Sequence, residues 1–190
     1  MNNSFVEDLN GVGFFKHLSI EESRVLQEKI YEVGWRGIFE NCNRFYPADA
    51  ENLAEGGIGQ FIKEVRPFLE SEGVRFPEIV DDAHENDYVV RVDGVANSIY
   101  SEPELLLDVA ATEGGLTWGL SMTRGFAIVD RLLAAVGSNE RVFAVNGGND
   151  LFAFFLTPEL CRVITTHPDA SPEDGPYKPT EEYPWFGQPH

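Results

Sequence analysis

The chain has 190 residues, which is enough for one domain of ordinary size and too few for two independent cores. With 43% hydrophobic and 12% aromatic residues it is not a disordered chain. Its 14 Lys and Arg against 32 Asp and Glu give a net charge of −18, which disfavours nucleic acid and anionic membranes as partners and favours basic proteins.

The first eight residues lack the cationic and apolar regions of a secretory signal. The longest apolar run, residues 151–156, is far shorter than the roughly 20 residues of a membrane helix. Cys42 and Cys161 have no CxxC spacing, so we interpret them as buried thiols and not as a disulfide or metal site. We therefore expect a cytoplasmic protein that has no membrane segment and no cofactor.

The first third of the chain has helical patterns. Ser19 and Glu22 form a capping-box motif, which predicts a helix over residues 20–33 that ends at Gly34. Residues 35–46 fit either a helix or irregular packing. Asp49 can cap a short helix, and an amphipathic helix follows from residue 58 with a break expected at Pro67.

From residue 87 the hydrophobic period changes to two. Asp93-Gly94 is typical of a type I′ turn, so residues 88–100 are predicted to form a β-hairpin in which Tyr88 faces Ile99. Residues 101–114 are expected to form a short helical connector. Residues 116–120 could be a short strand, and Thr123 begins a predicted helix over residues 123–136.

A second hairpin is predicted over residues 141–157, with a loop at residues 146–150. The predicted fold class is therefore α+β: an antiparallel sheet built from the two hairpins packs on helix 123–136, after a helical first third. Residues 151–156 are apolar on both faces, so either helices or a second subunit must cover them. A homodimer is one such arrangement.

Six prolines among residues 167–190 predict an irregular tail after a single domain of residues 1–166. The tail carries Tyr177, Tyr183, Trp185 and Phe186, which is more aromatic surface than a solvated linker needs. We expect part of this tail to lie along its own domain or along a partner.

The most acidic local sequence is residues 78–87, which we interpret as a solvated loop before the first hairpin. Its candidate partner-binding residues are Asp81, Asp82, Glu85 and Asp87. These carboxylates with His84 could also hold a divalent cation, but their spacing matches no metal motif, so we predict no metal.

Two glycine-rich segments are further candidates. Residues 56–59 open a helix and could bind an anion at their amides, although a helix–helix corner explains the same glycines. The hairpin loop at residues 146–150 carries three short polar side chains that could contact a ligand, or that only suit the turn itself: Asn146, Asn149 and Asp150.

The leading hypothesis is a non-enzymatic protein-binding module with an acidic surface for a basic protein partner. An immunity-type inhibitor of a cationic toxin has this charge and size. The alternative is a small hydrolase or transferase with a pocket between the helical third and the sheet, using His84, Ser121 or Asp150. No motif in the sequence arranges these three residues as a catalytic unit.

Overall fold

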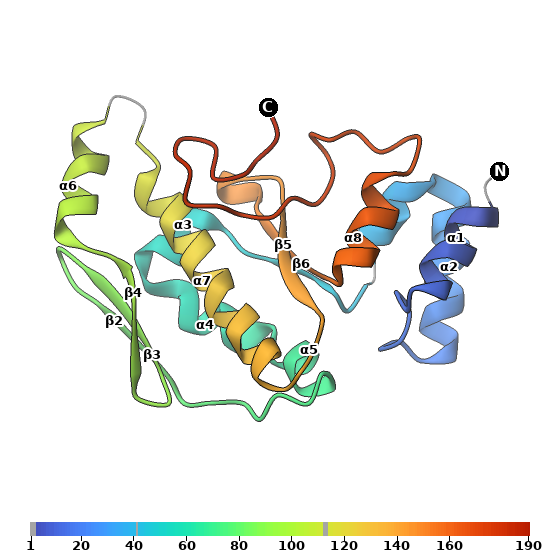
Figure 1. Ribbon diagram of the computed structural model, residues 1–190, viewed down its shortest axis with the longest axis horizontal. Coiled ribbons are helices and arrows are strands. Elements are labelled where there is room, and N and C mark those ends of the chain that lie inside the picture. Colours follow the sequence, from blue (N-terminus) through green and yellow to red (C-terminus); the bar gives the residue numbers. More distant parts are fainter. Residues whose placement is uncertain (1–2, 41, 112–113) are drawn as a thin grey trace.

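The computed structural model describes residues 3–40, 42–111 and 114–190 and confirms the α+β class. Six strands form two three-stranded antiparallel sheets, in the orders β2-β3-β4 and β1-β6-β5 (Figure 1). The strands are β1 (Phe45–Pro47), β2 (Ile79–Ala83), β3 (Tyr88–Val92), β4 (Val95–Tyr100), β5 (Arg141–Val145) and β6 (Phe152–Leu156).

The remaining elements are helical. The α-helices are α1 (Asn3–Gly11), α2 (Ile20–Val33), α3 (Ala50–Asn52), α4 (Ile58–Glu64), α5 (Arg66–Ser71), α6 (Glu102–Ala110), α7 (Leu116–Ala135) and α8 (Pro158–Thr165). The short 3-10 and π segments are η1 (Trp35–Phe39), η2 (Leu53–Gly57) and η3 (Gly148–Asp150).

The two predicted hairpins exist, but they belong to different sheets. Helix α7 lies between the sheets and contacts both β4 and β5 (Figure 1). Each sheet is completed by a strand that the sequence did not predict: β2 pairs with β3, and β1 pairs with β6. Both are hard to recognise locally, because β1 has only three residues and β2 carries two adjacent Asp residues, which are poor strand formers.

Helices of the same chain cover both faces of sheet β1-β6-β5, with α1, α2 and α8 on one side and α4, α5 and α7 on the other (Figure 1). Alternate residues of β6 enter two separate cores, as the period of a strand requires. Phe155 packs in the core with α7, whereas Phe154 packs in the core with α1, α2 and α8. A second subunit is therefore not needed to cover the apolar run at residues 151–156.

The capping signals place the helices well, with one exception. Helix α2 has the capping box between Ser19 and Glu22, and it covers the predicted residues 20–33. The predicted break near Pro67 lies at Val65, between α4 and α5. Helix α7, however, begins at Leu116 and not at Thr123, so the expected strand at residues 116–120 is wrong.

The first hairpin has the predicted turn, with positive φ angles of 47° at Asp93 and 79° at Gly94. Its register departs from prediction at one position: a bulge next to Tyr88 brings Tyr88 opposite Tyr100 instead of Ile99. The extra residue lets both Ile99 and Tyr100 point into the core, where they are buried.

The tail of residues 167–190 lies along the outer edge of β5. Tyr177 and Ala144 exchange two backbone hydrogen bonds of 2.8 and 2.9 Å, which extends the sheet by one residue. The ring of Phe186 packs against Gly119 of α7 and is buried. Tyr183 and Trp185 stay about half exposed, at 47% and 50%.

Candidate functional site

The acidic segment of residues 78–87 is not the solvated loop that the sequence predicted. Residues 79–83 form β2, and the carboxylate of Asp81 points to the start of α4. Its Oδ1 accepts hydrogen bonds from the Gly59 amide, at 2.9 Å, and from the Tyr88 hydroxyl. The Tyr88 oxygen in turn accepts from the Ile58 amide at 3.1 Å. Asp81 is therefore a helix cap and is not free to bind a partner.

The same contacts decide the role of the glycines at residues 56–59. Their position before α4 does favour an anion, as the helix dipole and free amides predict. The anion is the chain's own Asp81 carboxylate, which lies where a Cβ on Gly59 would be. Burial and the Asp81 charge together raise the pKa of Tyr88, so its hydroxyl stays a proton donor.

The other three predicted partner-binding residues differ from one another. Asp82 forms an ion pair with Arg91 across the strands at 2.7 Å. Glu85 lies exposed in the turn between β2 and β3, and Asp87 is partly exposed at its end. Neither carboxylate is in an ion pair among the described residues, and their role in partner binding stays a prediction.

The predicted ligand loop contacts the chain itself. The backbone oxygen of Asn146 accepts from the Tyr177 hydroxyl at 2.8 Å, and the amide of Asn149 reaches Glu51 at 3.3 Å. Gly147, Gly148 and the tail residues Trp185 and Phe186 line a small cavity of about 140 Å³. Asp150 is exposed and does not line this cavity. The loop thus helps to hold the tail.

The residues of the hydrolase alternative do not form a unit in the described part of the chain. His84 is exposed in the β2–β3 turn, Ser121 is fully buried within α7, and Asp150 is exposed in η3. No hydrogen bond joins any two of these three side chains, and the Ser121 hydroxyl has no hydrogen-bond partner. A nucleophile needs both a base and an exposed position.

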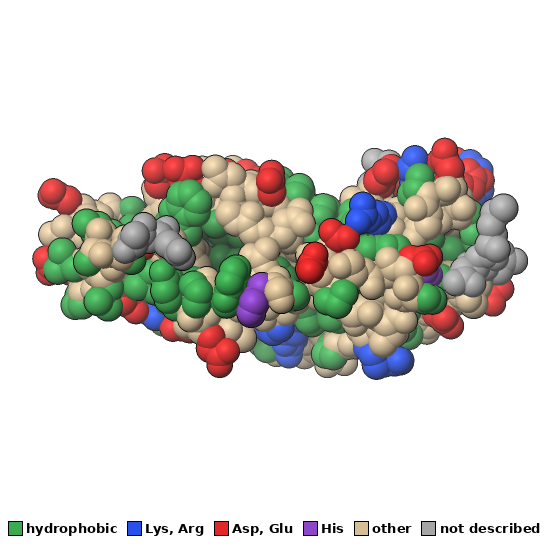
Figure 2. Space-filling view, turned by 90° about the horizontal axis from the view of Figure 1, so that it is seen from above, with side chains coloured by type: hydrophobic (Ala, Val, Ile, Leu, Met, Phe, Trp, Pro, Cys, Tyr) green, Lys and Arg blue, Asp and Glu red, His purple; other side chains and the backbone are tan. Residues whose placement is uncertain are grey.

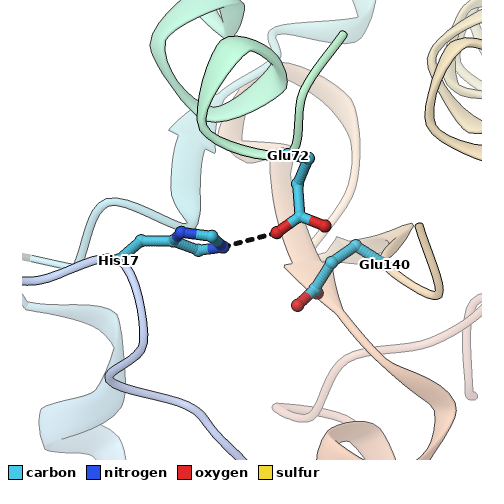
Figure 3. Close-up of side chains that lie close together, drawn as sticks. All are labelled: His17, Glu72 and Glu140. Carbon is cyan, nitrogen blue, oxygen red and sulfur yellow. Dashed lines mark hydrogen bonds and ion pairs between the residues drawn. The ribbon is translucent and has the colours of Figure 1, made fainter. Parts of the chain in front are cut away.

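A cluster that the sequence did not reveal brings together His17, Glu72 and Glu140, from three distant parts of the chain (Figure 3). His17 Nε2 lies 2.5 Å from Glu72 Oε1, and Glu140 is almost fully buried. Lys16 lies between the two carboxylates, 2.8 Å from Glu72 and 2.9 Å from Glu140. Fully buried Arg44 forms an ion pair with Glu140 at 2.8 Å.

The charges of this cluster are already balanced, because two cations face two carboxylates. Burial lowers the pKa of His17, and the charges of Arg44 and Lys16 lower it further, so the imidazole stays neutral at pH 7. A divalent cation would have to displace Lys16 from between the carboxylates. We therefore assign the cluster a structural role: removing one member of a buried pair costs about 3 to 5 kcal/mol.

Helix α6 is the unusual feature of the molecule, because its polar and apolar faces are reversed. Glu104 and Asp108, one turn apart, point toward α7. Leu106, Leu107 and Val109 are 61%, 64% and 77% exposed. A surface helix normally turns its apolar stripe to the core and its charges to water. This arrangement leaves an apolar surface on the outside of a short helix.

The inward carboxylates of α6 explain how the helix is held. Arg124 donates to Glu104 at 2.9 Å, and the hydrogen bonds from Arg124 lower the pKa of Glu104 to about 2. Asp108 accepts from the amides of Leu116 and Thr117, at 2.8 and 3.0 Å. Asp108 thereby caps the start of α7, which is the physical reason that α7 begins seven residues earlier than predicted.

The surroundings of α6 are strongly acidic. Residues 76–111 contain nine Asp and Glu and one basic residue, Arg91, so their net charge is 1 − 9 = −8. Because Tyr88 pairs with Tyr100, Asp87 lies close to the start of α6. Burial raises the pKa of Tyr100, and the negative charges of Asp87 and Glu55 raise it further. We call residues 76–111, which include β2 to α6, the acidic end.

Most basic side chains of the molecule are already in ion pairs and so do not offset the remaining negative charge of the acidic end. Nine of the 14 basic side chains form ion pairs within the described chain: Lys16, Arg24, Lys29, Arg36, Arg44, Arg66, Arg91, Arg124 and Lys178. Hydrophobic side chains gather near the surface around α6, with acidic ones beside them (Figure 2). Two of the nine carboxylates of the acidic end are in ion pairs, Asp82 with Arg91 and Glu104 with Arg124. The acidic end therefore combines an excess of negative charge with exposed apolar surface.

The fold and this surface define an acidic α+β protein with a charged and partly apolar end. Comparison with protein-family models, with curated proteins and with solved structures finds no match to this chain. Among the described residues, none of the helices has both the length and the apolar composition needed to cross a bilayer.

Proposed function

We propose that this chain is a non-enzymatic protein-binding module whose acidic end engages a basic protein partner. The observation that supports this most is the net charge of −8 over residues 76–111, where the one basic residue, Arg91, is already paired with Asp82. Such a concentration opposes compactness through self-repulsion, and it speeds association with a cationic surface. Inhibition of a cationic toxin, as an immunity protein does, is one activity of this kind.

The proposal includes a reducing, cytoplasmic setting. Cys42 and Cys161 are free thiols, and burial raises their pKa values to about 12 and about 11. Both are therefore poor nucleophiles at neutral pH. A second copy of the chain is a poor partner for the acidic end, because two ends of the same charge repel each other.

The test is the rate of association with a partner captured on the immobilised full chain and then purified. In one variant Glu85, Asp87 and Glu102 become Gln, Asn and Gln. In the control variant three exposed carboxylates outside the acidic end, Glu7, Glu159 and Glu173, become Gln. We expect the first variant to associate about tenfold more slowly at low salt, and the control variant much less so.

At 1 M salt the difference should nearly vanish, because the Debye length falls to about 3 Å. Equal effects of the two variants would show that the acidic end has no special role. Capture of only acidic or neutral partners would contradict the proposed function as a whole.

A further inference from the structure

Among the residues that the structure describes, the apolar outer face of α6 packs against no core cluster. Exposed Leu106 and Val109 are three positions apart and so lie on one side of the helix, and exposed Leu107 follows Leu106. Of the leucines of this helix, Leu105 packs against the core cluster that contains α7. The attachment of α6 to the rest of the molecule is largely polar, through Glu104 and Asp108. The helix would therefore stay in place if its outer side chains were polar, so folding alone does not explain why they are apolar.

The charge around this face limits what can cover it. Glu102 begins the same helix, and Asp87 lies beside that start through the pairing of Tyr88 with Tyr100. In a dimer that forms through α6, two acidic ends with a net charge of −8 each would face and repel each other. An anionic membrane would be repelled in the same way. A cationic amphipathic segment fits both properties, because its apolar side chains cover the leucines while its Lys and Arg pair with the carboxylates.

We infer that the outer face of α6 is the hydrophobic anchor of the interface, and that it docks a cationic amphipathic segment of a partner protein. This inference rests on the proposed function and specifies it. Charge at the acidic end brings the partner in, and burial of Leu106, Leu107 and Val109 holds it. Burial of apolar area is favourable, and the side chains that are fully desolvated at the centre of an interface carry most of its binding energy.

The test uses the full chain and three synthetic peptides of about 18 residues. The first is an amphipathic helix of Leu and Lys, the second replaces Lys by Glu, and the third replaces Leu by Ser. Fluorescence anisotropy gives Kd, and amide chemical shifts of the full chain locate the contact. We expect the Leu/Lys peptide to bind with shifts concentrated in residues 102–110, and the Leu/Glu peptide not to bind.

Two matched variants separate the anchor from general hydrophobicity. Leu106→Ser with Val109→Ser removes the anchor, and Ile20→Ser with Val33→Ser removes exposed apolar side chains of α2. We expect Leu106→Ser with Val109→Ser to raise the Kd of the Leu/Lys peptide about tenfold or more, and the control pair to leave this Kd unchanged. Urea unfolding checks that both variants stay folded, as the exposure of all four side chains predicts.

The outcomes distinguish this inference from the proposed function. If both double variants bind the Leu/Lys peptide as tightly as the unchanged chain does, the outer face of α6 is not the anchor. The proposed binding of a basic partner is still tested separately, by the charge variant of the acidic end. If the Leu/Glu peptide binds equally well, or if the chain dimerises through α6 in sedimentation, the cationic occupant is wrong. If the Ser/Lys peptide binds as tightly as the Leu/Lys peptide, charge alone suffices and the anchor has no role.

Discussion

Asp81 lies within the most acidic stretch of the sequence, yet its carboxylate binds inside the molecule. It accepts from the Gly59 amide and the Tyr88 hydroxyl, and so joins β2, β3 and α4. Its neighbour Asp82 points the other way, to Arg91 at the surface. Adjacent residues of a strand face opposite sides, so two identical side chains in sequence have different roles.

This difference predicts unequal effects of two substitutions. Asp81→Ala should lower the free energy of unfolding by about 2 kcal/mol, because it leaves the start of α4 and the Tyr88 hydroxyl without their charged acceptor. Asp82→Ala removes only an exposed ion pair and should cost less than about 1 kcal/mol. Urea denaturation of both variants measures this. Equal losses would contradict the capping role of Asp81.

At the scale of elements, α6 depends on ionised carboxylates for its position. A carboxylate whose pKa is lowered in the folded protein stabilises the fold above its unfolded pKa, and that contribution is lost as the pH falls through the folded pKa. For Glu104 this window runs from about 4.5 down to about 2. The helix should therefore loosen in acid before the cores do.

We expect the chain to be more stable than its Glu104→Gln variant at pH 7, and this difference to shrink steadily between pH 4.5 and pH 2. Denaturant unfolding at a series of pH values gives the difference directly. Glu102→Gln is the matched control, because this exposed carboxylate lies on the same helix. A pH-independent difference for Glu104→Gln would show that the ion pair with Arg124 does not hold α6.

Among the contacts that hold the tail, the one between Phe186 and Gly119 of α7 is especially close. A methyl group on Gly119 would overlap the Phe186 ring. Gly119→Ala should therefore cost about 1 to 3 kcal/mol by overpacking, and Phe186→Ala about 3 kcal/mol by loss of a buried ring. In the double variant Gly119→Ala should cost nothing further, because the Phe186 ring that the new methyl group would overlap is absent. Strict additivity in thermal or urea unfolding would show that the tail does not pack on α7.

For the whole molecule, the excess of negative charge opposes folding. Repulsion among like charges is screened by salt, whereas the fully buried pair of Arg44 and Glu140 is screened much less. We expect the thermal midpoint to rise by about 3 °C or more between 10 mM and 500 mM NaCl. Differential scanning calorimetry measures this. A fall in the midpoint would mean that surface ion pairs outweigh the general repulsion.

Local sequence patterns predict those features whose interactions lie within one short segment. The capping box of Ser19 and Glu22 fixed the start of α2, and Asp93-Gly94 fixed the turn of the first hairpin. The period-two pattern also located four strands and, with them, the α+β class. These signals are readable because both partners of each contact lie in the same short segment.

How these pieces combine depends on contacts between segments that are separate in the sequence. Strand β2 forms although its two Asp residues disfavour a strand, because it pairs with β3 and because the Asp81 carboxylate accepts a hydrogen bond at the start of α4. The outward apolar face of α6 arises because Arg124 and Thr117 bind the carboxylates of its other face. These contacts join residues that are between 5 and 22 positions apart, and the local pattern of each segment does not show which residues will pair.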